Sequence, residues 1–196
     1  VRGMEQSFKV VVLGQSGVGK TCLINSFDGK QFTTSTVSTL NAGFISKSVK
    51  LPQQSVRLIV WDTAGQERYA VIAPIYYRDA AATIIVFDVQ QPDSYQKSLQ
   101  FADSVRQINP KAQIVFAANK VDCDPVDVKV DTREILQQLK EKTFEMFEVS
   151  AKTGKNVAEM FQRVGELAFE VGGLKQVKKD LAFLEIEEPK PKTGCC

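Results

Sequence analysis

The sequence lacks several features on which whole classes of protein depend. Among its 196 residues there is no histidine, and its four cysteines, at positions 22, 123, 195 and 196, are too few and too unevenly spaced for a disulfide framework or a zinc site. Basic and acidic residues nearly balance, at 25 against 23, so the basic surface that is typical of nucleic-acid binding is missing. We therefore expect no nucleic acid among its partners and no zinc centre.

Long apolar runs are missing as well. None approaches the ~20 residues that a membrane-spanning helix needs, and the N-terminal VRGMEQSFK has no signal-peptide core. With 43% hydrophobic side chains, the chain suits one compact domain. We expect an N-terminal extension at residues 1–6, of which 1–3 precede Met4 as a cloning remnant, a folded domain at 7–172, and a flexible tail at 173–196.

Apolar runs alternate with amphipathic stretches along the domain. Near-continuous apolar runs, which are typical of strands covered on both faces, occupy residues 8–14, 56–61, 83–89, 113–120 and 144–150. Helical periodicity appears at about 20–28, 93–108, 132–142 and 155–171. This order predicts an α/β fold with a mostly parallel six-stranded sheet, helices on both faces, and one antiparallel edge strand joined by a hairpin around residues 50–55.

The first apolar run leads directly into GQSGVGKT, residues 14–21, which fits the pattern G-x-x-x-x-G-K-[ST] between a strand and a helix. Its glycines permit a loop whose backbone N–H groups point inward and, with the helix N-terminus, cradle a polyphosphate. Lys20 adds a positive charge on the β- and γ-phosphates, and Thr21 offers a hydroxyl to Mg²⁺. The alternative is an ordinary glycine-rich turn.

Another predicted strand ends in DTAGQER, so Asp62 lies at a carboxyl end, where open α/β sheets bind ligands. A carboxylate there holds Mg²⁺ through a water molecule. Gly65 brings a backbone N–H close to the γ-phosphate, and Gln66 is then placed to orient an attacking water. Taken alone, DTAG also fits a simple turn at the end of a strand.

The last two strands end in NKVD, residues 119–122, and SAK, residues 150–152. Asp122 matches the N1–H and the exocyclic amine of guanine, and with adenine this carboxylate would stay unpaired. Asn119 braces the phosphate loop, the Lys120 stem covers the base, and the Ala151 N–H meets guanine O6. An isolated N-K-x-D would favour a surface turn, but the order and placement of these motifs favour a guanine-nucleotide site.

Together GQSGVGKT, WDTAGQERY, YYRDA, NKVD, SAK and the double cysteine resemble the small GTPases of the Ras superfamily, and WDTAGQER with a terminal CC is similar to the Rab family within it. The likeness covers roughly residues 7–172, and TLNAGF and RYAVIAPIYYRDA are most similar to early-endosomal Rabs. It implies the P-loop NTPase fold of small G proteins. It also implies a GTPase switch that slowly hydrolyses GTP to GDP and phosphate and recruits effectors to membranes in vesicle trafficking.

The resemblance assigns further residues. Family spacing after the phosphate-loop lysine puts Phe32 at the guanine and Thr39 at Mg²⁺, and it makes Phe44, Trp61 and Tyr76 an aromatic triad for effectors. The alternative is that Phe44 and Trp61 simply pack on a face of the sheet. The full predicted nucleotide-binding set is Ser16, Gly17, Val18, Gly19, Lys20, Thr21, Cys22, Phe32, Thr39, Gly65, Asn119, Lys120, Asp122, Ser150, Ala151 and Lys152, with Thr21, Thr39 and Asp62 on the metal.

The resemblance also implies lipid anchoring and partners. Cys195 and Cys196 are expected to carry two geranylgeranyl groups, and the alternative is a solvated tail with two free thiols. The implied partners are effectors, an exchange factor, a GTPase-activating protein and a prenyl-binding chaperone of the GDI or escort type. We expect a monomer with GTP or GDP and Mg²⁺ that cycles between the cytosol and the cytoplasmic face of intracellular membranes, endosomes above all.

Two positions depart from the family pattern. Asn41 and Asp79 stand where such Rabs usually have glycine. Asparagine tolerates left-handed torsions, but the missing glycine at position 41 is expected to weaken sensing of the γ-phosphate, whereas Asp79 is expected to change surface charge only. Asn41 motivates one alternative function, a nucleotide-bound scaffold with little hydrolysis or switching. A P-loop phosphotransferase is a third hypothesis, but nothing in the sequence resembles an acceptor site or lid.

Overall fold

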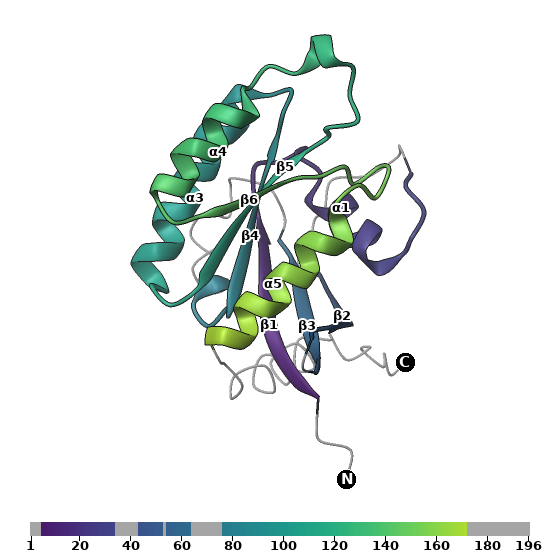
Figure 1. The fold of residues 1–196 in the computed structure, drawn as a ribbon, viewed down its shortest axis with the longest axis vertical. Helices are drawn as coiled ribbons and strands as arrows, with labels where there is room; N and C mark the ends of the chain where they lie inside the picture. Colours follow the sequence, from purple (N-terminus) through teal and green to yellow (C-terminus); the bar gives the residue numbers. More distant parts are fainter. Residues whose placement is uncertain (1–4, 34–42, 53, 64–75, 172–196) are drawn as a thin grey trace, which may run out of the picture.

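The computed structural model describes residues 5–33, 43–52, 54–63 and 76–171. Within them, six strands form one sheet in the order β2-β3-β1-β4-β5-β6 (Figure 1). The strands are β1 (Gln6–Leu13), β2 (Gly43–Lys50), β3 (Ser55–Asp62), β4 (Ala82–Asp88), β5 (Gln113–Asn119) and β6 (Glu145–Glu148). The pairs are parallel except for the edge strand β2, which runs antiparallel to β3, so the predicted sheet is confirmed.

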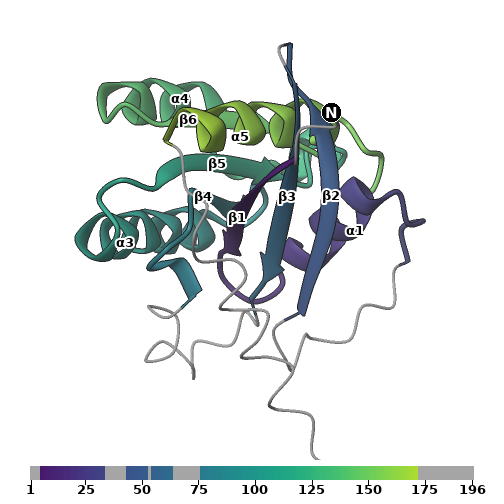
Figure 2. The same ribbon diagram turned by 90° about the horizontal axis from the view of Figure 1, so that it is seen from below.

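Helices cover both faces of this sheet. They are α1 (Lys20–Asp28), α3 (Pro92–Ile108), α4 (Thr132–Glu141) and α5 (Val157–Val171), and a 3-10 turn, η2, spans Pro125–Asp127. Side chains of α1 and α5 pack into one apolar cluster, and those of α3 and α4 pack into another. Figure 2 shows α1 and α3 on opposite sides of the sheet. None of the helices in the described part of the chain is long and apolar enough to span a membrane.

Alternate residues of the central strands supply the two clusters. In β1, Val10 and Val12 face α1 and α5, whereas Val11 and Leu13 face α3 and α4, and all four are at most 2% exposed. Because both faces are covered, every residue of β4 is buried as well. The unbroken apolar runs of the sequence therefore reflect burial on two sides.

The hairpin between β2 and β3 has the predicted position. The backbone N–H of Leu51 donates to the carbonyl of Gln54 at 2.8 Å, and Lys50 pairs with Ser55 at the end of the ladder.

The parallel strands end at one edge of the sheet. Val12 pairs with Asp62 between β1 and β3, and Asp88 pairs with Asn119 between β4 and β5. Polar residues from the ends of separate strands thus lie next to the loop that follows β1, at the edge where open α/β sheets bind ligands.

Candidate functional site

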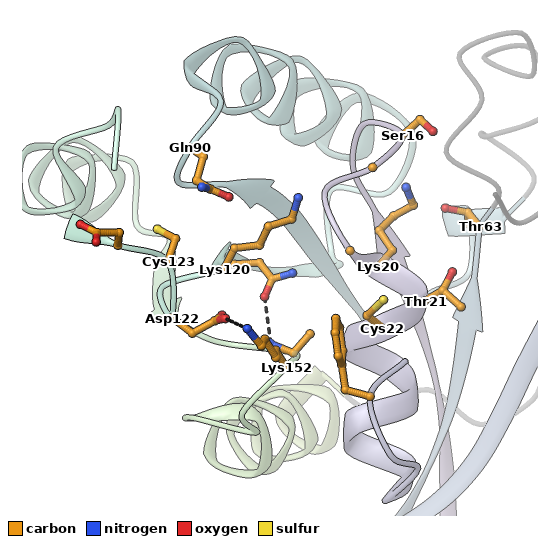
Figure 3. Close-up of a pocket in the computed structure, with 16 residues that line it drawn as sticks. Ser16, Lys20, Thr21, Cys22, Thr63, Gln90, Lys120, Asp122, Cys123 and Lys152 are labelled. Atoms are coloured by element: carbon orange, nitrogen blue, oxygen red, sulfur yellow. Dashed lines mark hydrogen bonds and ion pairs between the residues drawn. The ribbon is translucent and has the colours of Figure 1, made fainter. Parts of the chain in front are cut away.

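A cleft of about 570 Å³ lies at this edge (Figure 3). Its walls come from the loop after β1, the start of α1 and the segments that follow the other strands. They are lined by Ser16, Gly17, Gly19, Lys20, Thr21, Cys22, Phe32, Thr63, Gln90, Asn119, Lys120, Asp122, Cys123, Asp124, Ala151 and Lys152. The described residues of the predicted nucleotide set line this cleft, with two exceptions: Val18 and Ser150 support it from behind.

The loop after β1 has the backbone that a phosphate cradle requires. Gly19 has a φ of 95°, and a Cβ there would lie 2.5 Å from Asn119 Nδ2, while a Cβ on Gly14 would lie 2.3 Å from the Val86 carbonyl oxygen. Both positions therefore require glycine. Lys20, which is 5% exposed, donates from Nζ to the carbonyls of Gly14 and Gln15 at 2.9 Å each, so its charge lies inside the loop.

Thr21, which lines the cleft, contacts Asp62, the last residue of β3. Thr21 Oγ1 donates to Asp62 Oδ2 at 2.7 Å, although the two residues come from α1 and β3. The other carboxylate oxygen, Oδ1, is buried without a hydrogen-bond partner among the described residues. Burial raises the pKa of Asp62, and the Thr21 hydrogen bond and the charge of Lys20 oppose that rise. A buried carboxylate with a free oxygen beside a hydroxyl supplies the hard oxygen donors that Mg²⁺ prefers.

The opposite end of the cleft is held together by Asn119, which is 1% exposed. Its Nδ2 donates to the Val18 carbonyl at 2.8 Å, and its Oδ1 accepts the Ala151 N–H at 3.1 Å. One amide therefore joins the phosphate loop to the SAK segment. The sequence predicts the contact with the phosphate loop but not the one with the SAK segment.

Asp122 is fixed in the same region. Ser150 Oγ donates to Asp122 Oδ1 at 2.6 Å, and Lys152 Nζ lies 3.8 Å from Oδ2. Ser150 is buried and also accepts the backbone N–H of Thr153 at 3.0 Å. The Asp122 carboxylate is thus held in one orientation, which suits recognition of two adjacent N–H donors.

Sequence reasoning missed several residues of the site. Gln90, Cys123, Asp124 and Thr63 line the cleft. Asp88 is completely buried behind it and lies 2.6 Å from Lys120 Nζ. Asp88 could have been found, because like Asp62 it is an acidic residue at the carboxyl end of an otherwise apolar strand.

The three predicted effector aromatics lie in a row. The ring centroids of Phe44 and Trp61 are 5.5 Å apart, and those of Trp61 and Tyr76 are 6.3 Å apart. Phe44 is 42% exposed, but Trp61 is 5% exposed, so simple packing accounts for the tryptophan and not for Phe44. Asp79 is exposed, consistent with an effect on surface charge only.

Six predicted or singled-out positions lie outside the described residues: Thr39, Asn41, Gly65, Gln66, Cys195 and Cys196.

Comparison with known proteins points to the same family that the sequence motifs resemble. The model of the Ras family matches residues 9–170. Ras-related protein Rab-5A of Dictyostelium discoideum is 39% identical over 160 residues, which cover 81% of this chain and 79% of the relative. Ras-related protein Rab-15 of Rattus norvegicus is 35% identical over 193 residues, covering 95% and 91%, and that of Homo sapiens is 35% identical over 192 residues, covering 94% and 90%.

The family model thus spans nearly the whole folded domain, and these relatives exceed 30% identity over most of both chains. The chain therefore belongs to the Ras family of small GTPases, in its Rab group, and is a GTP-binding switch of vesicle trafficking that hydrolyses GTP.

Proposed function

We propose that the cleft holds GTP or GDP with Mg²⁺, its guanine between Phe32 and Lys120 and its phosphates in the loop of residues 14–21. The observation that carries this proposal is the double role of Asn119, whose one amide bonds both the phosphate loop and the segment that would meet guanine O6. The two ends of the cleft are therefore built as one unit of fixed span. A guanine nucleotide matches both ends.

Separate groups of residues bind the phosphates, the guanine and the metal ion in this proposal. The backbone N–H groups of residues 16–22 bind the phosphates, and Lys20 adds its charge. Asp122 accepts the guanine N1–H and amine, while the Ala151 N–H donates to O6. Thr21, Thr39 and, through a water molecule, Asp62 would hold Mg²⁺, which when bound neutralises charge on the β- and γ-phosphates.

Hydrolysis is assigned to Gln66, which orients the attacking water, with the Gly65 N–H near the γ-phosphate. The sequence offers no arginine obviously placed as an internal finger, so we expect slow intrinsic turnover. An arginine supplied by an activating protein is worth about 10³–10⁵ in rate. In the GTP state, Thr39 orders its segment around the γ-phosphate, and hydrolysis releases it.

The membrane cycle follows from the same family membership. Effectors would dock on Phe44, Trp61 and Tyr76, of which Phe44 offers the exposed ring. Geranylgeranyl groups on Cys195 and Cys196 would anchor the chain to the cytoplasmic face of endosomal membranes, because two long chains anchor stably where one binds marginally. An exchange factor loads GTP, and a prenyl-binding chaperone returns the GDP form to the cytosol as a monomer.

Single-turnover GTP hydrolysis tests the catalytic part of this proposal. The full-length protein is loaded with GTP, Mg²⁺ is added, and phosphate release is followed for the wild type and for Gln66→Leu. The proposal expects slower release from Gln66→Leu. Equal rates for the two proteins would favour the scaffold alternative, which family membership does not favour.

Locating the full-length protein in its own cell tests the membrane part. A form without Cys195 and Cys196 serves as the control. The proposal expects endosomal staining that the deletion converts to diffuse cytosolic staining. Unchanged membrane staining after the deletion would contradict the assigned anchor.

A further inference from the structure

Asp88, the last residue of β4, is a fully buried carboxylate beside the nucleotide cleft. Both of its oxygens have partners. Oδ1 accepts the backbone N–H of Gln90 at 2.9 Å, and Oδ2 accepts Gln91 Nε2 at 3.0 Å and lies 2.6 Å from Lys120 Nζ. A buried carboxylate is costly unless it is paired and hydrogen-bonded, and Asp88 meets both conditions.

Lys120 is constrained in both its backbone and its side chain. Its φ of 69° lies in the left-handed region, which a lysine adopts only where its surroundings impose it. Its side chain is 35% exposed and lines the cleft. A long side chain of this kind has many accessible rotamers, and the ion pair to Asp88 restricts them. The aliphatic stem is thereby held along the wall of the cleft.

The other contacts of Asp88 tie Lys120 to α3. The backbone N–H of Asp88 donates to Ser94 Oγ at 2.9 Å, and the backbone N–H of Gln91 donates to the Asp88 carbonyl at 3.0 Å. Gln91 is the N-cap residue of α3, yet its side chain bonds Asp88 and makes no capping bond to the helix. The turn that carries Gln90 into the cleft is therefore held by the same carboxylate as Lys120.

We propose that Asp88 is a positioning residue that holds the Lys120 stem against the face of bound guanine and thereby slows nucleotide release. This inference rests on the proposed guanine-nucleotide site, since Lys120 has a base to cover only if that site is correct. Asp88 acts through Lys120 and not by contact with the nucleotide. The rate of GDP dissociation, and not only stability, should therefore respond to the charge at position 88.

The direct test is Asp88→Asn in the full-length protein. Asparagine keeps an oxygen acceptor for the Gln90 N–H but removes the negative charge that faces Lys120. Dissociation of a fluorescent GDP, chased with excess GDP in Mg²⁺, is expected to become about tenfold faster, because hydrogen bonds between charged groups are the stronger ones. A rate within twofold of the wild type would overturn the proposal.

Glu145→Gln is the matched control. It removes a carboxylate that pairs with Arg163 at 2.7 Å between β6 and α5, and neither residue lines the cleft. The proposal expects GDP dissociation from this variant to match the wild type, since loss of an ion pair alone should not free the nucleotide. Equal acceleration by both variants would mean that Asp88 acts through general stability, which would overturn the proposal.

A second comparison separates positioning from structural support. Lys120→Met keeps an apolar stem but removes the ammonium, so Asp88→Asn should add nothing to its effect on GDP dissociation. Effects that multiply would overturn the proposal. If Asp88→Asn lacks a cooperative thermal transition, Lys120→Arg and Lys120→Met decide instead. The arginine variant keeps the charge and should release GDP nearly as slowly as the wild type, whereas the methionine variant should release it faster. Equal rates of GDP release from the arginine and methionine variants would overturn the proposal.

The nucleotide selectivity of the wild type separates failure of the proposed guanine site from failure of the role proposed for Asp88. Retention of a fluorescent ADP as long as GDP would refute the proposed guanine site, and this inference with it. If the wild type and Asp88→Asn both retain GDP longer than ADP but release GDP at equal rates, the inference about Asp88 alone is refuted.

Discussion

Replacing Asn119 with alanine should weaken the fold and the nucleotide site together. The side chain is 1% exposed and makes two buried bonds, to the Val18 carbonyl at 2.8 Å and from the Ala151 N–H at 3.1 Å. Alanine leaves both partners unsatisfied, and each buried orphan costs about 1–3 kcal/mol. The free energy of unfolding should therefore fall by about 2–6 kcal/mol, a large part of the roughly 5–15 kcal/mol that a domain possesses.

Equilibrium urea unfolding at fixed GDP and Mg²⁺ measures this change, and a thermal scan should show a midpoint at least about 4 °C lower. GDP dissociation from the variant should also be faster, because the phosphate loop and the Ala151 segment lose their shared brace. Gln138→Ala is the control, since its amide bonds Tyr95 at 3.2 Å and Glu134 at 3.1 Å near the surface. A loss below about 1 kcal/mol for Asn119→Ala, or an equal loss for Gln138→Ala, would refute the reasoning.

Three further predictions follow from the same geometry. Gly19→Ala should abolish GDP binding in a fluorescence titration, because the new Cβ would lie 2.5 Å from Asn119 Nδ2. Gly29→Ala is the control: Gly29 has a similar φ of 86° but nothing within 4 Å of a Cβ, so this variant should lose only about 1 kcal/mol of stability and keep GDP binding. Burial raises the pKa of Asp62 above its usual 3.8, so in the metal-free wild type the stability that this one group contributes is lost as pH rises through that raised pKa. In EDTA, Asp62→Asn should therefore be more stable than the wild type toward urea at pH 7, by a margin that shrinks toward pH 3; a constant margin would contradict this assignment. Trp61, the chain's one tryptophan, lies between Phe44 and Tyr76 in the aromatic row. Its emission should therefore change between the GDP form and a form with a non-hydrolysable GTP analogue, and identical spectra would count against coupling of the row to the nucleotide.

The secondary structure could be predicted because burial leaves a periodic pattern in neighbouring residues of the sequence. Two-sided burial makes each central strand an apolar run, and one-sided burial gives each helix its period, so the helix predicted at 20–28 is found at Lys20–Asp28. The predicted start of α5, at about residue 155, lies two residues before the observed one. Gly154 and Asn156 adopt left-handed torsions, at φ 81° and 56°, and the chain turns there before the helix begins at Val157.

The cleft was only partly predictable, for a different reason. Residues with a motif, such as Lys20 and Asp122, could be named from their spacing. The place of Asp88 at the end of an apolar strand is visible in the sequence, but its ion pair with Lys120 is not, because the two residues are distant along the chain. Gln90 lines the cleft but belongs to no motif. The 3-10 turn at Pro125–Asp127, which Asp124 caps by accepting the Val126 N–H at 3.0 Å, was also missed. Its three residues are too few to show a period.

Selectivity for guanine over adenine tests the central claim most directly. Fluorescent GDP, GTP and ATP are titrated separately into the nucleotide-depleted full-length protein with Mg²⁺. Because Asp122 is held by Ser150 at 2.6 Å and would be left unpaired by adenine, the account predicts that GDP and GTP bind about 10⁴-fold more tightly than ATP. Equal affinity for ATP, or no binding of GDP and GTP, would contradict it.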